Sequence, residues 1–285
     1  MILIADSGAT KTDWLFNDGL HSHLIKTEGI NPFHLQDDKI MDILAEGLYP
    51  CVKEQLNESR QIHKIFFYGA GCLPTHCKGI WNALHELFPL SNIEINTDLL
   101  GAARALCGHE AGIACILGTG ANSCLYDGNQ IQRNISPLGY ILGDEGSGAY
   151  LGKRFVSDCF KEQLPTFLRD GLLEELNLTY TDIINKVYKE PQANRFLASL
   201  TPYIYKQKNE AEVHSFLLDC FTTFFRRNVL PYHAELPISF TGSISWYFQE
   251  EVKEAAVNLG LHTKLFLKNP IEGMANFHGI QYAKE

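Results

Sequence analysis

Two stretches of the chain, about a hundred residues apart, follow the same pattern of an apolar strand, a turn of small residues and a returning strand. The first runs from Met1 to Phe16 and the second from Gly112 to Tyr126. Each opens with a short continuous apolar run, which is typical of a strand buried on both faces. Because the pattern occurs twice, it predicts two lobes built on one plan, facing each other across a cleft.

The first turn follows Asp6 and consists of small residues, namely Ser7, Gly8, Ala9 and Thr10. Small residues allow backbone N–H groups to approach an anion, while Lys11 adds a positive charge and Thr10 and Thr12 add hydroxyls. The turn is therefore suited to binding a phosphate while Asp6 holds a hydrated divalent cation. It is not a P-loop, because a strand rather than a helix follows it. Taken alone, the stretch fits an ordinary hairpin equally well.

The second turn is richer in glycine and consists of Gly118, Thr119, Gly120, Ala121 and Asn122. A further glycine turn, at Gly242 and Ser243, follows a buried strand over 237–240 and opens a helix that runs from Ser245 to Leu259. A helix that begins directly after a strand and a glycine presents free N–H groups, which suit a nucleotide. The chain thus offers two phosphate-sized turns and one helix start of the kind that contacts nucleotides.

The hydrophobic spacing elsewhere predicts alternating helices and strands. Strands are expected at 12–16, 20–26, 62–68, 93–96, 131–135 and 262–267, and helices at 37–56, 80–88, 99–106 and over most of 150–235. This order indicates an α/β fold of mixed sheets flanked by helices. We expect an N-terminal lobe over 1–107 and a C-terminal lobe over 108–285 with a helical insertion at about 150–235. The final helix, 270–283, is expected to pack back on the N-terminal lobe.

The composition argues against several classes of protein. The 285 residues are 45% hydrophobic, which is ample for folded cores. Lys and Arg number 24 against 33 Asp and Glu, so the formal net charge is −9 and no basic field gathers nucleic acid or anionic lipid. The apolar run after Met1 is too short for a signal peptide or a membrane span. We therefore expect a cytoplasmic protein that binds neither nucleic acid nor membrane.

Eight cysteines occur without a C-x-x-C pair, and most lie in apolar patterns typical of buried, reduced thiols. Cys72 and Cys77 are the only close pair, and they flank a proline in an expected loop. A metal or cluster role for this pair stays open as the less favoured interpretation.

Five motifs, taken together and in order, resemble those of a known superfamily. They are D-x-G-x-T-K-T at 6–12, E-G-I-N-P at 28–32, N-T-D at 96–98, I-L-G-T-G-A-N at 116–122 and G-Y-I-L-G-D-E-G-S at 139–147. They resemble the superfamily of actin, sugar kinases and heat-shock chaperones. Within it, the chain is most similar to the BadF/BadG/BcrA/BcrD ATPase family, in particular its N-acetylglucosamine kinase branch. The resemblance spans nearly the whole chain and implies two ribonuclease H-like, actin-like ATPase lobes.

The resemblance also implies roles for individual residues. Gly8 to Thr12 would form the first phosphate loop, Gly118 to Gly120 the second, and Asp6 would hold Mg²⁺ through water. Gly242 and Ser243 would lie against the adenosine of ATP. Asp98 would act as the general base, and the residues around the sugar would be Asn31, Asp98, Asn122, Gly139, Tyr140, Asp144 and Glu145. These residue types suit the task, since planar amides and carboxylates pair with sugar hydroxyls while an aromatic ring covers an apolar face.

Four of these residues also have a purely structural interpretation. Thr97 or Asp98 is a natural N-cap for the helix that starts at Leu99. The segment 143–147 fits a turn and cap before the next helix, and Asn31 fits the capping of a turn. Structural and functional roles can coexist at one residue, so both interpretations stay open here.

The function implied by the resemblance is an ATP-dependent kinase that phosphorylates an N-acetylated amino sugar, first of all N-acetylglucosamine at its 6-hydroxyl. One alternative is an ATPase that activates a 2-hydroxyacyl-CoA dehydratase and carries an iron–sulfur cluster between two subunits, for which only Cys72 and Cys77 offer paired thiolates. Another is a non-catalytic sugar sensor, although the chain shows no DNA-binding module. Glucosamine, N-acetylmannosamine, a muramic-acid sugar or a non-sugar alcohol stay open as acceptors. A homodimer is expected by analogy with two-lobed kinases of this plan.

Overall fold

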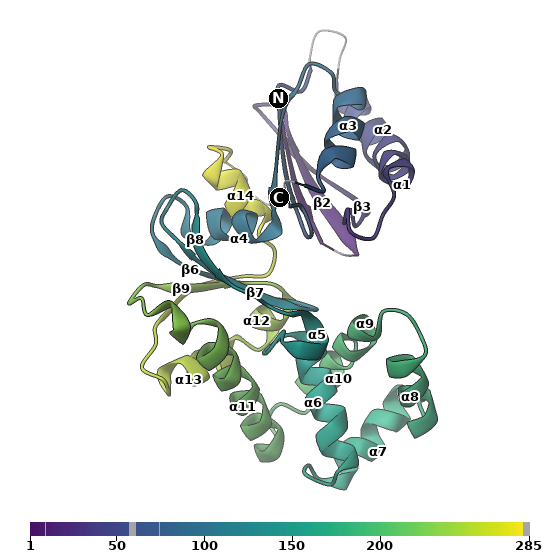
Figure 1. Cartoon of the computed structure of the whole chain (residues 1–285), viewed down its shortest axis with the longest axis vertical. Coiled ribbons are helices and arrows are strands. Elements are labelled where there is room, and N and C mark those ends of the chain that lie inside the picture. The colour runs from purple at the N-terminus through teal and green to yellow at the C-terminus, as the bar shows by residue number, and fades with distance from the viewer. Residues whose placement is uncertain (9, 57–60, 74, 282–285) are drawn as a thin grey trace. The chain divides into compact units, whose positions relative to one another are not determined.

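The computed structural model describes residues 1–8, 10–56, 61–73 and 75–281. Contacts within the chain divide it into two compact units. Unit 1 comprises Met1–Glu110, Asp127–Ile131 and Asn269–Glu285, and unit 2 comprises Ala111–Tyr126 and Gln132–Lys268. The described residues form two five-stranded sheets flanked by helices (Figure 1), which confirms the predicted α/β class with two sheets of one plan.

The sheet of unit 1 contains β1 (Ile2–Ser7), β2 (Lys11–Asn17), β3 (Ser22–Glu28), β4 (Lys64–Gly69) and β5 (Asn92–Thr97). Their order across the sheet is β3-β2-β1-β4-β5. The first three strands form the predicted antiparallel meander, whereas β4 and β5 run parallel to β1. The first expected phosphate turn therefore joins the central strand to its antiparallel neighbour.

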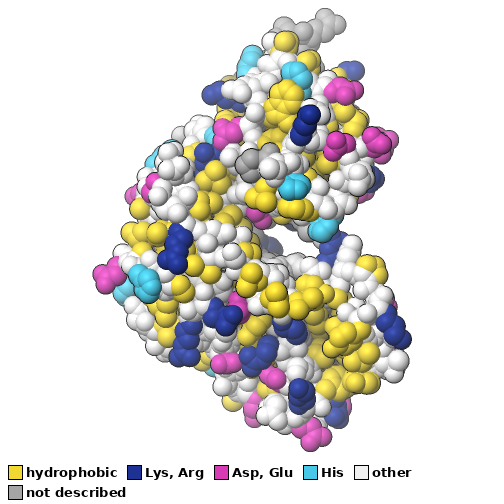
Figure 2. Space-filling model, in the orientation of Figure 1, with side chains coloured by type: hydrophobic (Ala, Val, Ile, Leu, Met, Phe, Trp, Pro, Cys, Tyr) yellow, Lys and Arg dark blue, Asp and Glu magenta, His cyan; other side chains and the backbone are white. Residues whose placement is uncertain are grey.

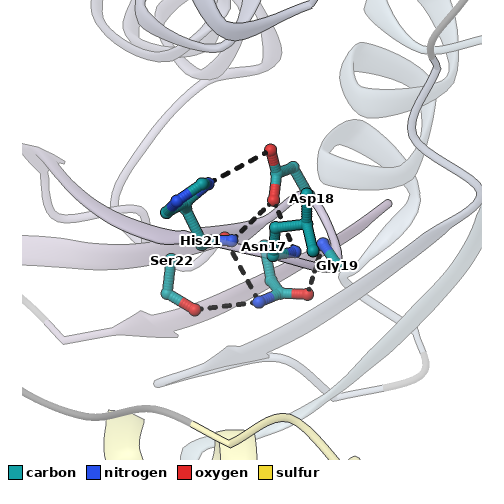
Figure 3. A network of polar contacts seen from close by, with 6 residues as sticks. Asn17, Asp18, Gly19, His21 and Ser22 are labelled. Carbon is teal, nitrogen blue, oxygen red and sulfur yellow. Dashed lines mark hydrogen bonds and ion pairs between the residues drawn. The ribbon is translucent and has the colours of Figure 1, made fainter.

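The turn between β2 and β3 shows how local chemistry fixes this meander (Figure 3). The Asp18 carboxylate accepts hydrogen bonds from the backbone N–H groups of Leu20 and His21, each at 2.7 Å. The Asn17 side chain accepts from the Gly19 N–H at 3.0 Å, and Gly19 has a φ of +98°. An Asn-Asp-Gly sequence is thus stable here because its side chains and its glycine satisfy the tight turn.

The two faces of this sheet have different partners because alternate residues of a strand point to opposite sides. Leu3, Ala5, Trp14 and Phe16 share one core with helical residues such as Ile40. The helical residues of this core come from α1 (Asp37–Asp42), the π-helical segment η1 (Ile43–Leu48), α2 (Tyr49–Gln55) and α3 (Lys78–Leu87). Asp6 and Asp13 have the opposite parity and therefore belong to the other face.

That other face is covered by α4 (Asp98–Cys107) and α14 (Ile271–Phe277), which lie side by side in Figure 1. The two helices approach closely, since a Cβ on Gly273 would lie 2.4 Å from the carbonyl oxygen of Ala105. At the end of α14, His278 Nε2 lies 2.8 Å from the Tyr68 hydroxyl, and its ring stacks on Phe66 with centroids 3.6 Å apart. The last helix is thereby fixed to β4.

His278 makes the stability of unit 1 depend on pH. Burial, followed by the nearby Arg104 charge, lowers the pKa of His278 from 6.5 to about 4. The folded state therefore favours the neutral imidazole, and its contribution is complete above the unfolded pKa and lost as pH falls from 6.5 to 4. We expect wild type to lose on the order of 2 kcal/mol more than His278→Gln between pH 7 and pH 4. Urea unfolding of both proteins at each pH measures the difference, and parallel losses would contradict it.

The sheet of unit 2 repeats the plan of unit 1. It contains β6 (Gly112–Leu117), β7 (Ala121–Tyr126), β8 (Ile131–Ile135), β9 (Ile238–Thr241) and β10 (Thr263–Leu267). Their order is β10-β9-β6-β7-β8, with β7 antiparallel and β9 parallel to the central β6. The second expected phosphate turn joins β6 to β7, so the two turns occupy equivalent places in the two sheets.

Helices dominate the rest of unit 2, as the hydrophobic spacing predicts. They are α5 (Gly139–Leu142), α6 (Gly148–Phe160), α7 (Thr166–Glu175), α8 (Tyr180–Tyr188), α9 (Ala193–Ala198), α10 (Thr201–Lys206), α11 (Ala211–Asn228), the 3₁₀ turn η2 (Leu230–Tyr232), α12 (Ser243–Tyr247) and α13 (Gln249–Val257). All of them except α5 and α8 contribute apolar residues to one core with β6 and β9. None of the helices in the described parts of the chain is long and apolar enough to cross a membrane.

Three elements differ from the prediction. The helix expected from Ser245 to Leu259 is two helices that meet at Phe248, whose ring is buried against Phe221 and Tyr205. The final helix ends at Phe277, because Gly279 has a φ of +73° and Ile280 N–H bonds back to Ala275. Residues 282 and 283 of that predicted helix lie outside the described residues. The short helix α5 was not predicted.

Candidate active site

The first turn of unit 1 is held by hydrogen bonds among its own residues. Gly8 N–H bonds to the Lys11 carbonyl at 3.0 Å, and the Ser7 and Thr12 hydroxyls lie 2.7 Å apart. Thr12 donates to the Glu28 carbonyl at 3.0 Å, so its hydroxyl is engaged within the fold. Thr10 and Lys11 are exposed, whereas Ala9 lies outside the described residues. The turn thus has a fixed base formed by Ser7 and Thr12 and an exposed tip.

Asp6 and Asp98 are brought close together at the ends of β1 and β5. The pKa of Asp6 is raised to about 7, mainly by burial and then by the negative charges of Asp98 and Asp13, while the Lys11 charge opposes them. Burial also raises the pKa of Asp98, opposed by a hydrogen bond from the Leu99 N–H to Oδ1 at 2.9 Å. A carboxylate whose pKa lies above its ordinary value is a better proton acceptor once ionised.

The capping role at the start of α4 belongs to Thr97 rather than to Asp98. The Thr97 hydroxyl accepts a hydrogen bond from the Leu100 N–H at 3.2 Å, and Thr97 has an extended backbone. Asp98 is the first residue of the helix, and its carboxylate accepts a hydrogen bond from the adjacent Leu99 N–H. One of the two sequence interpretations is thereby resolved, since the cap does not require Asp98.

Asp13 is an acidic neighbour of Asp6 that was not predicted as a site residue. It faces Asp6 directly across the β1–β2 pair and is 2% exposed. Its Oδ2 atom accepts from Lys11 Nζ at 2.6 Å and from Asn269 Nδ2 at 3.2 Å. The signal was present in the sequence, because a carboxylate within the apolar strand Thr12 to Phe16 needs a partner.

Asn31 caps a turn, the interpretation that its own loop favours. Its side-chain oxygen accepts from the Phe33 N–H at 2.9 Å. A Cβ on Gly71 would lie 2.5 Å from the same oxygen, so the loop after β4 packs closely against Asn31. This contact fixes the position of the amide.

The second turn, in unit 2, leads into the start of α6. The Gly148 N–H donates to the Gly118 carbonyl at 2.8 Å, and the Ala149 N–H donates to the Thr119 carbonyl at 3.1 Å. A Cβ on Gly118 would meet no atom of the described residues within 4 Å, so the backbone there borders open space. Such a backbone allows the close approach of an anion.

Gly242 lies against the second turn. It has a φ of +112°, and a Cβ at this position would lie 2.4 Å from the Leu117 carbonyl oxygen and 3.3 Å from the Gly118 nitrogen. Only glycine fits this close approach of two backbones. Ser243 follows as the first residue of α12. The structure therefore brings together the two segments of unit 2 that the resemblance assigns to the phosphates and the adenosine.

Asp144 lies beside the same turn. Its Oδ1 accepts from the Ala121 N–H at 3.3 Å, and a Cβ on Gly120 would lie 3.1 Å from Oδ2. Burial raises the pKa of Asp144 to about 6, with the Ala121 hydrogen bond and the Lys153 charge lowering it and the Glu145 charge raising it. The φ of Asp144 is +55°, an uncommon backbone conformation that is often found at functional sites.

Glu145 is buried and held by α11. Arg227 Nε lies 2.5 Å from Glu145 Oε1, and Asn228 Nδ2 donates to Oε2 at 3.2 Å. These partners were not predicted, because nothing in the local sequence indicates which residues of a distant helix approach. Glu145 thus fixes the loop that carries Asp144.

The other expected sugar residues of unit 2 lie on β7 and α5. Asn122 Oδ1 accepts from Asn134 Nδ2 at 2.8 Å. The Tyr140 carbonyl accepts from Lys153 Nζ at 2.7 Å, and Tyr140 lines a groove of about 590 Å³ between α5, α6 and α8. Figure 2 shows hydrophobic side chains gathered over this part of unit 2, where Ile141, Leu142 and Tyr188 are exposed.

Asp6 and Asp13 fit a hydrated divalent cation. No group of three or more His, Cys, Asp or Glu side chains in the described ranges is placed to hold a metal ion. Mg²⁺ commonly uses only one or two carboxylates and keeps several of its waters. Asp13 Oδ1 is buried and has no hydrogen-bond partner among the described residues, which leaves it available to a metal-bound water.

Cys72 and Cys77 lie in contact in the loop that follows β4. Cys72 is buried, and Cys77 Sγ lies 2.9 Å from the Leu73 carbonyl oxygen. Burial raises the pKa of both thiols, whereas metal-binding and reactive cysteines need a stabilised thiolate. Both line a pocket of about 610 Å³ together with Trp81 and Thr97.

Comparison with solved structures places the chain among proteins of closely related architecture. A Porphyromonas gingivalis protein provisionally named N-acetylglucosamine kinase is 43% identical, with 98% of each chain covered and a TM-score of 0.93. A Chromobacterium violaceum protein with the same provisional name is 15% identical, over 97% of this chain and 98% of that one, with a TM-score of 0.72.

A non-polymerising MamK mutant bound to AMPPNP shares the fold at 13% identity, over 97% of this chain and 96% of that one, with a TM-score of 0.51. No protein-family model matches the sequence, and none of the curated proteins matches it. The likeness at 43% identity extends over nearly the whole length of both chains, so it includes both sheets and all three glycine turns.

Proposed function

The chain belongs to the family of actin-like, ATP-dependent sugar kinases that includes the Porphyromonas gingivalis protein, and we propose on that premise that it phosphorylates an N-acetylated amino sugar. The first candidate is N-acetylglucosamine, with its 6-hydroxyl as the acceptor. One observation carries the proposal beyond the fold: Asp98, directly after β5, is a half-buried carboxylate with a raised pKa, and its charge acts on Asp6 of β1. The name BadF/BadG/BcrA/BcrD for the family stays a prediction.

Asp98 is the proposed general base. As the sugar hydroxyl attacks the γ-phosphate of ATP, the Asp98 carboxylate accepts its proton. Burial raises the pKa of Asp98 above that of an ordinary aspartate, which makes the ionised carboxylate a stronger proton acceptor, while the Leu99 N–H holds one oxygen in place. The transition state of phosphoryl transfer is loose, so positioning and charge neutralisation contribute more than covalent chemistry.

ATP is proposed to be bound by backbone groups of both turns. Gly8, Thr10, Lys11 and Thr12 belong to the first turn, and Gly118, Thr119 and Gly120 to the second, with Gly242 and Ser243 against the adenosine. Lys11 is exposed and carries the positive charge of the first turn. When bound, Mg²⁺ neutralises charge on the phosphates, and Asp6 would hold it through water.

Asn31, Asn122, Gly139, Tyr140, Asp144 and Glu145 are the proposed sugar residues. Asp144 is the best supported of the acids, because its carboxylate is partly buried beside the second turn and keeps an oxygen near Gly120. Glu145 supports that loop through Arg227 and Asn228. The cytoplasmic location and the homodimer stay predictions.

The two alternative functions have less support. An activator of a 2-hydroxyacyl-CoA dehydratase needs cysteine thiolates for its cluster, and burial raises the pKa of both Cys72 and Cys77. A non-catalytic sugar sensor would have no use for an acid with a raised pKa such as Asp98.

The test is ADP release by the purified protein with Mg-ATP and a panel of sugars. The panel contains N-acetylglucosamine, glucosamine, N-acetylmannosamine and N-acetylmuramic acid. We expect one N-acetylated sugar to stimulate ADP release strongly, and phosphate on its 6-oxygen by NMR of the product. Slow ATP hydrolysis that is indifferent to every sugar would refute the kinase assignment.

A further inference from the structure

Asp13 carries a buried oxygen that the fold does not satisfy. The residue is 2% exposed, and its Oδ1 atom has no hydrogen-bond partner among the described residues. A buried acceptor left unpaired costs about 1–3 kcal/mol, and more when it is charged. A fold that keeps such an atom is expected to use it for a ligand.

Asp13 lies where it can contact the same ligand as Asp6. The two residues are direct partners in the antiparallel β1–β2 pair, so their side chains lie on one face of the sheet. That face is the one covered by α4 and α14.

The charges around this point are unbalanced. Asp6 on β1, Asp13 on β2 and Asp98 at the start of α4 are acidic, and Asn269, before α14, contributes a neutral amide. Lys11 supplies a positive charge to Asp13 Oδ2, but its own side chain is 55% exposed and free to follow a phosphate. Three carboxylates against one exposed ammonium favour a further cation.

We propose that Asp13 is the second carboxylate of the magnesium site, with Oδ1 accepting a hydrogen bond from a water of the cation that Asp6 holds. The inference rests on the proposed function, since it deepens the metal role given to Asp6. It assigns Oδ1 to the hydrated cation and Oδ2 to Lys11 and Asn269. Asp13 is thus a positioning residue that contacts the hydration shell and does not touch the sugar.

The competing interpretation is structural: Asp13 would serve only to hold Lys11 and Asn269. The two interpretations predict different metal affinities, because an Asn at position 13 keeps an oxygen that accepts from Asn269 while it removes the charge. We therefore propose to measure Mn²⁺ binding to the full chain by electron paramagnetic resonance of free Mn²⁺, with Mg²⁺ as competitor. The exposed Asp42 on α1, across the sheet, provides a charge-matched control.

We expect Asp13→Asn to weaken Mn²⁺ binding by about tenfold or more, and Asp42→Asn to leave it within about twofold of wild type. Asp6→Asn tests the same site in case the first variant does not fold, and it should weaken Mn²⁺ binding at least as much, because Asp6 holds the cation. The inference is overturned if wild type binds no Mn²⁺, or if the folded variant, Asp13→Asn or Asp6→Asn, binds it as wild type does. Mn²⁺ binding needs no sugar, so these outcomes are distinguishable from a failure of the kinase assay.

Discussion

Asp98→Asn is expected to lower kcat of the sugar kinase by about 10²–10⁴-fold while the KM values for ATP and sugar change little. The reason is that Asn matches the shape of Asp and can still accept the Leu99 N–H, which lies 2.9 Å from Oδ1, but cannot take a proton. Steady-state kinetics with the preferred sugar measures both parameters. A large rise in KM at unchanged kcat would show that Asp98 binds sugar without acting as base.

Thr97→Ala is the matched control for this experiment. Thr97 provides the N-cap of α4 through its hydroxyl, 3.2 Å from the Leu100 nitrogen. Its loss should cost about 1 kcal/mol of stability and leave kcat near that of wild type. If Thr97→Ala and Asp98→Asn reduce kcat equally, the start of α4 matters through its structure, and the general base has to be sought elsewhere.

Gly242→Ala is expected to destabilise unit 2 by roughly 2–4 kcal/mol and to weaken ATP binding as well. The added Cβ would lie 2.4 Å from the Leu117 carbonyl, and the φ of +112° disfavours any L side chain, so the backbone of two strands must shift. Thermal unfolding followed by circular dichroism measures the stability. Nucleotide affinity comes from titration calorimetry with ADP on the protein that remains folded.

Gly118→Ala separates the two effects of Gly242→Ala. A Cβ at Gly118 meets no described atom within 4 Å, so the fold should be nearly unaffected. The same methyl group would stand where the phosphates approach the backbone, so ADP binding should weaken by tenfold or more, about 1.4 kcal/mol. A stable Gly118→Ala protein with unchanged ADP affinity would contradict the role of the second turn.

Much of the fold could be predicted because the local chemistry is strong. The two hairpins follow apolar runs that end in turn-forming residues such as Asn17, Asp18 and Gly19, and the structure contains both hairpins at the expected places. The parallel strands β4 and β9 are short apolar runs after long helical or loop segments, which is how α/β folds return to a sheet. The repetition of one pattern then predicted a second sheet of the same order.

What the sequence could not reveal depends on contacts between distant residues. The short helix α5 begins after Leu138, whose φ is +62°, and that backbone state follows from packing and not from the propensity of leucine. The helix predicted from Ser245 to Leu259 is interrupted at Phe248, whose ring is buried against Phe221 of α11. Helix boundaries of this kind depend on tertiary packing, so the hydrophobic periodicity of the sequence does not predict them accurately.

The candidate site was predictable where glycines and acids follow strands, and unpredictable where partners come from elsewhere. Asp6, Gly118 and Gly242 were found because each stands at the end of an apolar run. Asp13 was not predicted as a site residue because it stands within such a run, where hydrophobic residues dominate the pattern. Because a buried carboxylate needs a partner, an acidic residue inside an apolar strand, such as Asp13 opposite Asp6, should be examined as a candidate binding residue.

The contact of Asn269 with Asp13 can form only late in synthesis, because Asn269 lies near the C-terminal end of the chain. Unit 1 is formed by residues up to Glu110 together with the segment that begins at Asn269. Until the ribosome has translated that segment, the face of the first sheet that bears Asp6 and Asp13 has neither α14 over it nor Asn269 against it. The first lobe to be made is therefore among the last to be finished, and a nascent chain cannot hold the surroundings of Asp6 and Asp13 in final form before unit 2 has been synthesised.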